Sequence, residues 1–325
     1  MSMKKFWIVL TVALAMLLCA CDSQSQATQP VDTPTIPQTP SGVVTDSVPR
    51  RFAQQGEILY FSAGDSILSY RDGAMELLCT ADAPDYLFVS ESNLIHREVQ
   101  TRGDDNSPEQ YKVVSRSVDN AEAETLLFYG EILWVYVYGE TVWMMTSAGD
   151  LVAVPAAGGE MQVFQLGMTD IPSAWEQKLY FTNGSAILCM DLETKQQHTV
   201  LEKNAALNLF AYEKNIYFST EESSVLENFD IETGVLSQHE NVPCIGLNGH
   251  EGKLYYVQNS EGTFELRCFD GTQIAAACAL GALQVCSEPY FADSGIYFYI
   301  GSDDYYGLVF VDAQGRLTKL ETSEG

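Results

Sequence analysis

The chain has 325 residues, of which 46% are hydrophobic and 11% aromatic, and it carries a formal net charge of −27. This apolar content is ample for a large buried core, and the aromatic fraction favours a β-rich domain. A chain this acidic is repelled by nucleic-acid phosphates and by anionic lipid head groups, so we expect no nucleic-acid partner.

The first twenty residues have the features of an export signal. A positive start, Met1–Lys5, precedes an apolar stretch, Phe6–Leu18, that is too short to span a bilayer comfortably. The sequence Leu18-Cys19-Ala20-Cys21 resembles the lipobox of bacterial lipoproteins, in which the last cysteine is diacylglycerylated and becomes the new N-terminus. We predict that residues 1–20 are a lipoprotein signal peptide and that Cys21 is lipidated. An ordinary signal peptide and an uncleaved anchor are the alternatives.

Residues 21–49 then form the predicted tether, because proline, serine, threonine and glutamine dominate it. Such a segment stays extended at about 3.1 Å per residue, which is enough to hold a domain clear of a membrane. These features predict a protein that is lipid-anchored to the cell membrane through Cys21 and faces the extracytoplasmic side. Asp22 resembles an inner-membrane retention signal of enteric bacteria, so a periplasmic and a Gram-positive surface location both stay open.

One phrase of a turn followed by an aromatic strand recurs along the rest of the chain. Its anchors Tyr180, Tyr217, Tyr255 and Tyr297 are 37, 38 and 42 residues apart, a period typical of repeat architectures. The seven copies, of which the second is degenerate, are Gly56–Phe61, Glu91–His96, Gly139–Met144, Glu176–Phe181, Glu213–Phe218, Glu251–Tyr256 and Asp293–Phe298.

Each period has room for four short strands joined by tight turns such as Asp72-Gly73 and Asp270-Gly271. The sequence therefore predicts that residues 50–325 form an all-β domain, a β-propeller of four-stranded antiparallel blades. Seven blades are favoured, with six or eight as alternatives. We expect the first innermost strand within Asp46–Ala53, where it would close the ring against the last blade.

Acidic residues gather in the predicted loops between the second and third strands, which propeller topology places on one rim. A ring of carboxylates could hold a cation such as calcium, or a basic ligand, although a chain this acidic has carboxylates in most loops. Two tyrosines at the same rim add the aromatic surface that is common at interfaces. The candidate rim residues are Asp65, Asp104, Asp105, Asp150, Glu221, Glu222, Glu261, Asp303, Asp304, Tyr305 and Tyr306.

No linear catalytic motif is present. The four histidines are isolated, and metal-ligand spacings, phosphate-binding glycine loops and nucleophile elbows are missing from the sequence. The sequence therefore offers no catalytic residue and calls for no cofactor, although a propeller can assemble an axial site from one residue per blade. Six cysteines follow the tether; some could pair in an exported protein, but we interpret them as small buried residues.

With its lipobox, tether and repeats, the chain resembles an uncharacterised bacterial lipoprotein family whose β-propeller is likened to that of the low-density-lipoprotein-receptor-related proteins. The receptor repeat reads Tyr-Trp-Thr-Asp, whereas this chain has Tyr60-Phe61-Ser62-Ala63 and Tyr180-Phe181-Thr182-Asn183. The repeat's aspartate is missing, and those propellers have six blades. The resemblance therefore implies the fold and not the receptors' ligands.

The function that the sequence favours is a membrane-anchored, non-catalytic binding or scaffold module for a protein or a glycan. One alternative is an extracytoplasmic hydrolase or lyase with an axial propeller site. Another is an envelope protein-assembly factor.

Lipidation gives the first testable prediction. Replacing Cys21 with alanine should abolish incorporation of radiolabelled fatty acid, because no other cysteine stands at the end of the lipobox. Equal labelling of the variant and the wild type would show that the protein is anchored in another way, or not at all.

Overall fold

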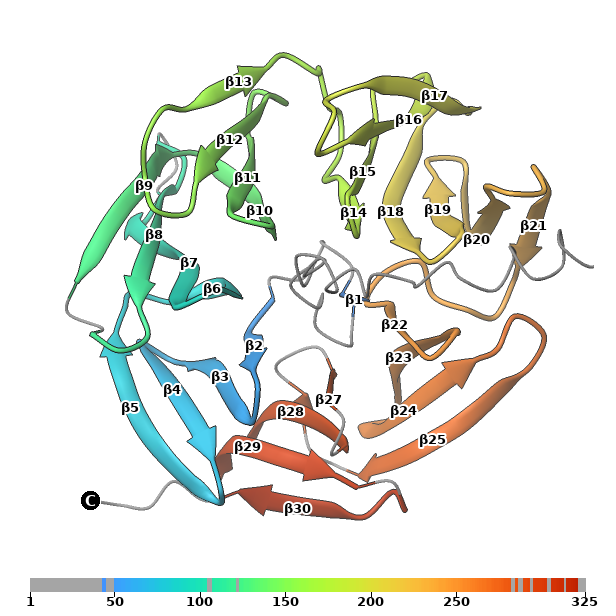
Figure 1. The fold of residues 1–325 in the computed structure, drawn as a ribbon. Helices are drawn as coiled ribbons and strands as arrows, with labels where there is room; N and C mark the ends of the chain where they lie inside the picture. Colours follow the sequence, from blue (N-terminus) through green and yellow to red (C-terminus); the bar gives the residue numbers. More distant parts are fainter. Residues whose placement is uncertain are drawn as a thin grey trace, which may run out of the picture. The chain divides into compact units, whose positions relative to one another are not determined.

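The computed structural model describes residues 43–44, 50–103, 107–120, 123–281, 284–285, 289–292, 295–302, 305–312 and 314–320. Seven blades, each built on four antiparallel strands, stand in a ring around a central axis (Figure 1). The protein is thus an all-β, seven-bladed β-propeller, as the repeats predicted. Across the described residues, no helix is long and apolar enough to cross a membrane.

Each of the first three blades comes from one continuous segment, with its strands in sequence order from the axis outward. Blade 1 contains β2 (Phe52–Gln55), β3 (Ile58–Ala63), β4 (Ser66–Arg71) and β5 (Ala74–Thr80). Blade 2 contains β6 (Asp85–Ser90), β7 (Asn93–Thr101), β8 (Gln110–Ser117) and β9 (Glu124–Gly130). Blade 3 contains β10 (Ile132–Tyr138), β11 (Thr141–Thr146), β12 (Leu151–Pro155) and β13 (Gln162–Phe164).

The other four blades follow the same plan, except that the inner strand of blade 7 is in two pieces. Blade 4 contains β14 (Ser173–Trp175), β15 (Lys178–Thr182), β16 (Ala186–Asp191) and β17 (Gln197–Glu202). Blade 5 contains β18 (Ala206–Tyr212), β19 (Asn215–Thr220), β20 (Ser223–Asp230) and β21 (Leu236–His239). Blade 6 contains β22 (Asn248–His250), β23 (Lys253–Ser260), β24 (Thr263–Phe269) and β25 (Ile274–Gly281). Blade 7 contains β26 (Gln284–Val285), β27 (Tyr290–Ala292), β28 (Gly295–Ser302), β29 (Tyr305–Val311) and β30 (Leu317–Leu320).

One more strand lies inside the ring. β1 (Val43–Val44) pairs antiparallel with the inner edge of β22, Val43 opposite Gly249 and Val44 opposite Asn248. It belongs to the segment that the sequence predicts as tether. At least two residues of that segment therefore join the sheet of blade 6.

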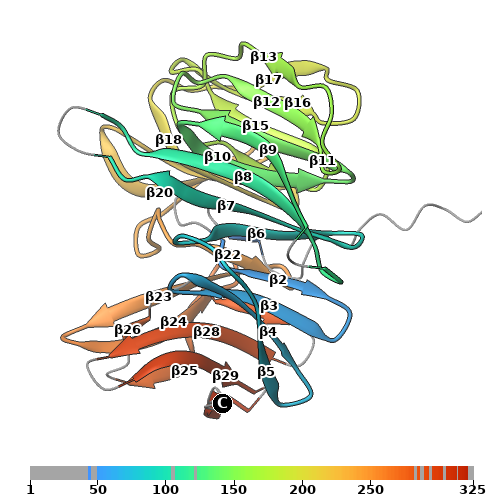
Figure 2. The ribbon, with the colours of Figure 1, turned by 90° about the vertical axis from the view of Figure 1, so that its left-hand side faces the viewer.

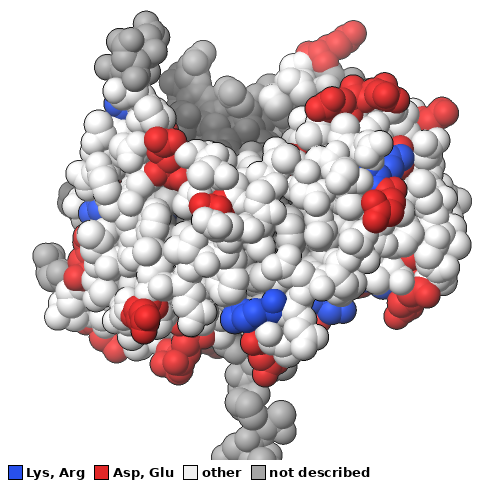
Figure 3. Space-filling model, turned by 90° about the horizontal axis from the view of Figure 1, so that it is seen from above, with Lys and Arg blue, Asp and Glu red and all other residues white. Residues whose placement is uncertain are grey.

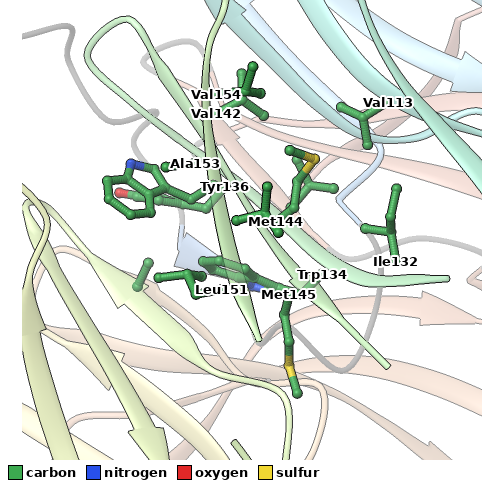
Figure 4. Close-up of a cluster of buried hydrophobic side chains, with 14 of the residues drawn as sticks. Val113, Ile132, Trp134, Tyr136, Val142, Met144, Met145, Leu151, Ala153 and Val154 are labelled. Carbon is green, nitrogen blue, oxygen red and sulfur yellow. The ribbon is translucent and has the colours of Figure 1, made fainter. Parts of the chain in front are cut away.

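The repeated phrase forms the second strand of each blade. In β3, β11 and β19 the four central residues are all buried, although the side chains of a strand point alternately to the two sides of its sheet. Both sides are buried because each blade packs between two neighbours. Buried clusters follow these interfaces, and the largest joins blades 2, 3 and 4 around Trp134, Tyr136 and Met144 (Figure 4).

Aromatic packing closes the ring between its first and last blades. Phe52 of β2 stacks on Tyr290 of β27, with ring centroids 5.6 Å apart, and on Phe61 of β3 at 6.2 Å. Phe61 in turn contacts Tyr299 of β28 at 6.5 Å. The prediction for the first innermost strand is therefore only partly right. It begins at Phe52 and pairs with β3 of its own blade, while blade 7 takes its inner strands from its own segment. Residues 46–49 lie outside the described part of the chain.

Blade 2, which has the degenerate copy of the phrase, buries charged groups instead of an aromatic pair. His96 is fully buried, and its Nε2 lies 2.7 Å from Oε1 of Glu98. Glu98 also forms ion pairs with Arg116 at 3.1 Å and with Lys112 at 3.2 Å, and both cations pair with Glu124. Buried charges need such partners, because burying an isolated charge would cost on the order of several kcal/mol in lost hydration.

The opposite face of blade 2 holds a second buried ion pair. Arg97 donates to both carboxylate oxygens of Asp85, at 2.8 and 2.6 Å. Its guanidinium carbon lies 4.7 Å from the ring centre of Tyr86 and 4.0 Å from that of Tyr111. Carboxylate and aromatic groups thus hold a cation at the interface with blade 3.

Cys189, Cys244, Cys268 and Cys278 have free thiols, and Cys286 lies outside the described part of the chain. Cys268 is opposite Ala275, not Gln273 as a two-residue turn at Asp270-Gly271 would require, because that turn is two residues longer. Cys189, Cys244 and Cys278 are buried, which agrees with their interpretation as small core residues.

The ring closure predicts a large effect for one substitution. Phe52→Ala should lower the free energy of unfolding by about 3 kcal/mol, because Phe52 is 2% exposed and its removal leaves a cavity between blades 1 and 7. Chemical denaturation measures this. As a control, Tyr129→Ala on the outer strand β9, where the side chain is 53% exposed, should change stability by less than about 0.5 kcal/mol. Equal losses in the two variants would contradict this account of closure.

The buried histidine predicts a pH dependence of stability. Burial lowers the pKa of His96 below its ordinary 6.5, although the contact with Glu98 opposes the shift. The unfolded chain therefore takes up a proton first, and the free energy of unfolding falls as the pH drops below about 6.5. Burial alone would raise the pKa of Glu98, but the hydrogen bonds from His96 and Arg116 and the Lys112 charge hold it at about 2, so its contribution is lost only at much lower pH.

Melting temperatures measured from neutral to mildly acidic pH test this. His96→Asn should be less stable than the wild type at neutral pH but should lose less stability on acidification. Burial also lowers the pKa of His239, so the part of the pH dependence of stability that His239 contributes should remain in the His96→Asn variant. His198→Asn, on the exposed part of β17, is the matched control and should follow the wild type. An unchanged slope in His96→Asn would disprove the assignment.

Candidate functional site

The order of the strands gives the ring two distinct faces. Successive turns of an antiparallel blade alternate between its two ends, so the first and third turns share one face and the second turns lie on the other. We call these the inner-turn face and the rim face. Figure 2 shows the turns after β2 and β6 on the right.

The predicted rim residues that the structure describes lie on the rim face, as expected. Asp65, Glu221, Glu222 and Glu261 are exposed in second turns, and Asp150 is half-buried. The corresponding turn of blade 4, between β15 and β16, has no carboxylate. Oδ1 of Asp65 accepts a hydrogen bond from the Ala83 amide at 3.4 Å, which is a structural role.

The structure does not bring the described rim residues together. Within the described ranges, no three histidine, cysteine, aspartate or glutamate side chains are close enough to hold a metal ion. Asp104, Asp105, Asp303 and Asp304 lie outside those ranges, and Tyr305 and Tyr306 begin β29. In the flank view of Figure 3 the acidic side chains gather mostly toward the two faces, and the surface between them is largely uncharged.

A groove of about 390 Å³ lies on the other face, the inner-turn face, between blades 4 and 5. Blade 4 contributes two aromatic residues and two charged ones, and blade 5 contributes its first and third turns. We call it the blade 4–5 groove; its lining residues are Trp175, Glu176, Lys178, Tyr180, Glu213, Lys214, Ile231 and Glu232.

Trp175 is held in place by blades 5 and 6. Its ring meets that of Tyr212 edge to face, with centroids 5.0 Å apart. The Tyr212 hydroxyl accepts a hydrogen bond from the Gly252 amide at 2.8 Å, and its ring lies so close to Gly249 that a Cβ atom there would overlap it. The aromatic wall of the groove is therefore preorganised by packing.

The groove carries charges of both signs. Lys214 forms ion pairs with Asp230 at 3.3 Å and with Glu232 at 3.6 Å, and these contacts raise its pKa. The Tyr180 side chain is only 2% exposed, and burial raises the pKa of its phenol. The groove thus offers ammonium donors together with carboxylate acceptors.

Two of its glutamates occupy a turn position that normally favours glycine. Glu176 and Glu213 both have φ near +53°, and the equivalent residues of blades 1 and 3 are Gly56 and Gly139. A side chain in this conformation costs roughly 1 kcal/mol relative to glycine. Glu91 and Glu251 take the same conformation in the first turns of blades 2 and 6.

The predicted rim does not include this face, although the repeated phrase itself contains the acidic residues that lie on it. Every copy of the repeated phrase has an acidic residue in its first two positions, and six of these lie in the described first turns: Glu57, Glu91, Glu140, Glu176, Glu213 and Glu251. All six are exposed.

No protein-family model matches the chain, and no curated protein matches it. Among solved structures, the β-propeller domain of the Trilobed protease from Pyrococcus furiosus matches over 87% of this chain and 97% of that one, with 10% identity and a TM-score of 0.55. Acylaminoacyl peptidase from Pyrococcus horikoshii matches over 84% and 52%, with 10% identity and a TM-score of 0.54.

BamB from Moraxella catarrhalis matches over 78% of this chain and 80% of that one, with 13% identity and a TM-score of 0.47. At such identities, the two structures with TM-scores above 0.5 show only a shared fold, which for the Trilobed protease domain is a β-propeller. They do not assign it a ligand or a reaction.

Proposed function

We propose that this protein is a lipid-anchored, extracytoplasmic binding module that holds a partner protein in the blade 4–5 groove. The main support for this proposal is the groove itself, which combines a fixed tryptophan with charged groups at its edge. Aromatic anchors inside a polar rim are the usual arrangement at protein-binding surfaces. The leader, Cys21 and the tether supply the anchoring part of the proposal.

The pairing of charges in the groove favours a binding role. Its lining consists of tryptophan, tyrosine, isoleucine, glutamate and lysine, and Lys214 is already paired with Asp230 and Glu232. A protein partner is favoured over a glycan because charged side chains outnumber aromatic ones in the lining. Charged residues of a partner can pair with them, which neutral sugars cannot do.

Site-specific crosslinking in intact cells tests this function. A photo-crosslinking residue in place of Lys178 should give a protease-sensitive adduct of discrete mass, and the adduct should disappear when Trp175→Ala is added. The same residue in place of Leu77, which is 61% exposed on the outer strand β5, is the control and should give none. An adduct that resists protease but is removed by glycosidases would favour a glycan. Failure to obtain any adduct at position 178 would contradict the proposal.

A further inference from the structure

Blades 4 and 5 each have the same type of turn between their third and fourth strands. The two sequences are Asp191-Leu-Glu-Thr-Lys195 and Asp230-Ile-Glu-Thr-Gly234. In each, the aspartate carboxylate accepts hydrogen bonds from the amides two and three residues later, at 2.7–3.1 Å. The fifth amide donates to the aspartate carbonyl at 2.8 Å in both. The fifth residues, Lys195 and Gly234, have φ of 64° and 70°, so the two turns have the same backbone conformation.

In blade 4 the fifth residue reaches across to the preceding blade. Nζ of Lys195 lies 4.0 Å from the ring centre of Trp143 in blade 3, and it also donates to the carbonyl of Leu192. Burial lowers the pKa of this ammonium, although the charges of Asp191 and Glu193 oppose the shift. The interface between blades 3 and 4 is therefore completed by an internal lysine that lies against an aromatic ring.

The interface between blades 4 and 5 has the equivalent turn and an aromatic residue at the equivalent position, but its turn has no lysine. Tyr180 holds the fifth position of the repeated phrase, which in blade 3 is Trp143. Gly234 stands where blade 4 has Lys195, and a Cβ atom at Gly234 would meet nothing within 4 Å. The groove of about 390 Å³ lies at this interface.

The charges around the groove also favour a cation. Lys214 is paired with Asp230 and Glu232, and Lys178 is opposite Asp191 in the sheet. Glu176 and Glu213 then add two exposed carboxylates at the first turns. An incoming ammonium group would meet more negative than positive charge, beside the fixed ring of Trp175.

From this comparison and from the charges of the groove we propose that the blade 4–5 groove binds the side chain of a lysine from the partner protein, at the interface equivalent to the one that Lys195 completes one blade earlier. The assignment rests on the proposed function, because it names the group that the same groove recognises. The aliphatic stem would lie along Ile231 and the ammonium beside the Trp175 ring and the carboxylates, because Tyr180, the equivalent of the ring that Lys195 covers, is itself only 2% exposed.

The test uses the full chain in detergent, labelled with 5-fluorotryptophan, with the Trp175 signal assigned from the Trp175→Phe variant. An acetyl-Gly-Lys-Gly-amide peptide should shift this ¹⁹F signal, and raising the salt concentration should weaken the response. The same peptide acetylated at the lysine Nζ should bind at least about tenfold more weakly, since it has lost the charge that the ring and the carboxylates recognise.

Gly234→Lys gives the sharper comparison. Lys195 shows that this turn accepts lysine, so the variant should fold, move the Trp175 signal without peptide and lose the peptide response. Gly234→Ala, which adds a side chain without an ammonium, is the matched control and should respond as the wild type does. Equal responses to the two peptides, or an undiminished response in Gly234→Lys, would overturn the proposal. A crosslink at position 178 that persists in Gly234→Lys, with no response to either peptide, would leave the groove a binding site and refute only the lysine assignment.

Discussion

The structure depends on the packing of each blade between two neighbours. A four-stranded sheet with two apolar faces is not stable by itself, and the ring solves this only if its first and last blades also meet. In this protein, that contact is made by the stacked rings of Phe52, Tyr290 and Phe61, with Tyr299 beside them. In the described part of the chain β1 adds to the sheet of blade 6, but blades 1 and 7 share no strand, so side-chain packing holds them together.

The same constraint explains why departures from the repeat are informative. Any group placed between two blades must either pack or find a partner. In blade 2, His96 stands where other copies of the phrase have an aromatic residue. His96 contacts Glu98, and Arg116 on the neighbouring strand pairs with Glu98, so the interface becomes ionic. Blade 4 uses Lys195 to cover Trp143. Where Gly234 provides no side chain, an aromatic-lined groove lies between the blades.

The two faces of the ring therefore differ in what they can bind. The rim face has exposed carboxylates on separate loops, which the described residues do not bring together into a metal site. The inner-turn face has a groove whose tryptophan is fixed by Tyr212, with two strained glutamates beside it. A recognition site needs groups that are already positioned before the ligand arrives, and this favours the inner-turn face.

The sequence by itself determined the fold class and the strand that each phrase forms, and it favoured seven blades over six or eight. It could do so because tight turns and aromatic strands are local features that repeat with a fixed period. It also placed Asp65, Glu221 and Glu261 on one face, since turns alternate in any antiparallel blade. It did not indicate that His96 would find Glu98 and Arg116, or that Trp175 would lie against Tyr212 of the next blade. Those contacts join residues from different strands and blades, so only the tertiary structure decided which side chains meet and where a groove is left between them.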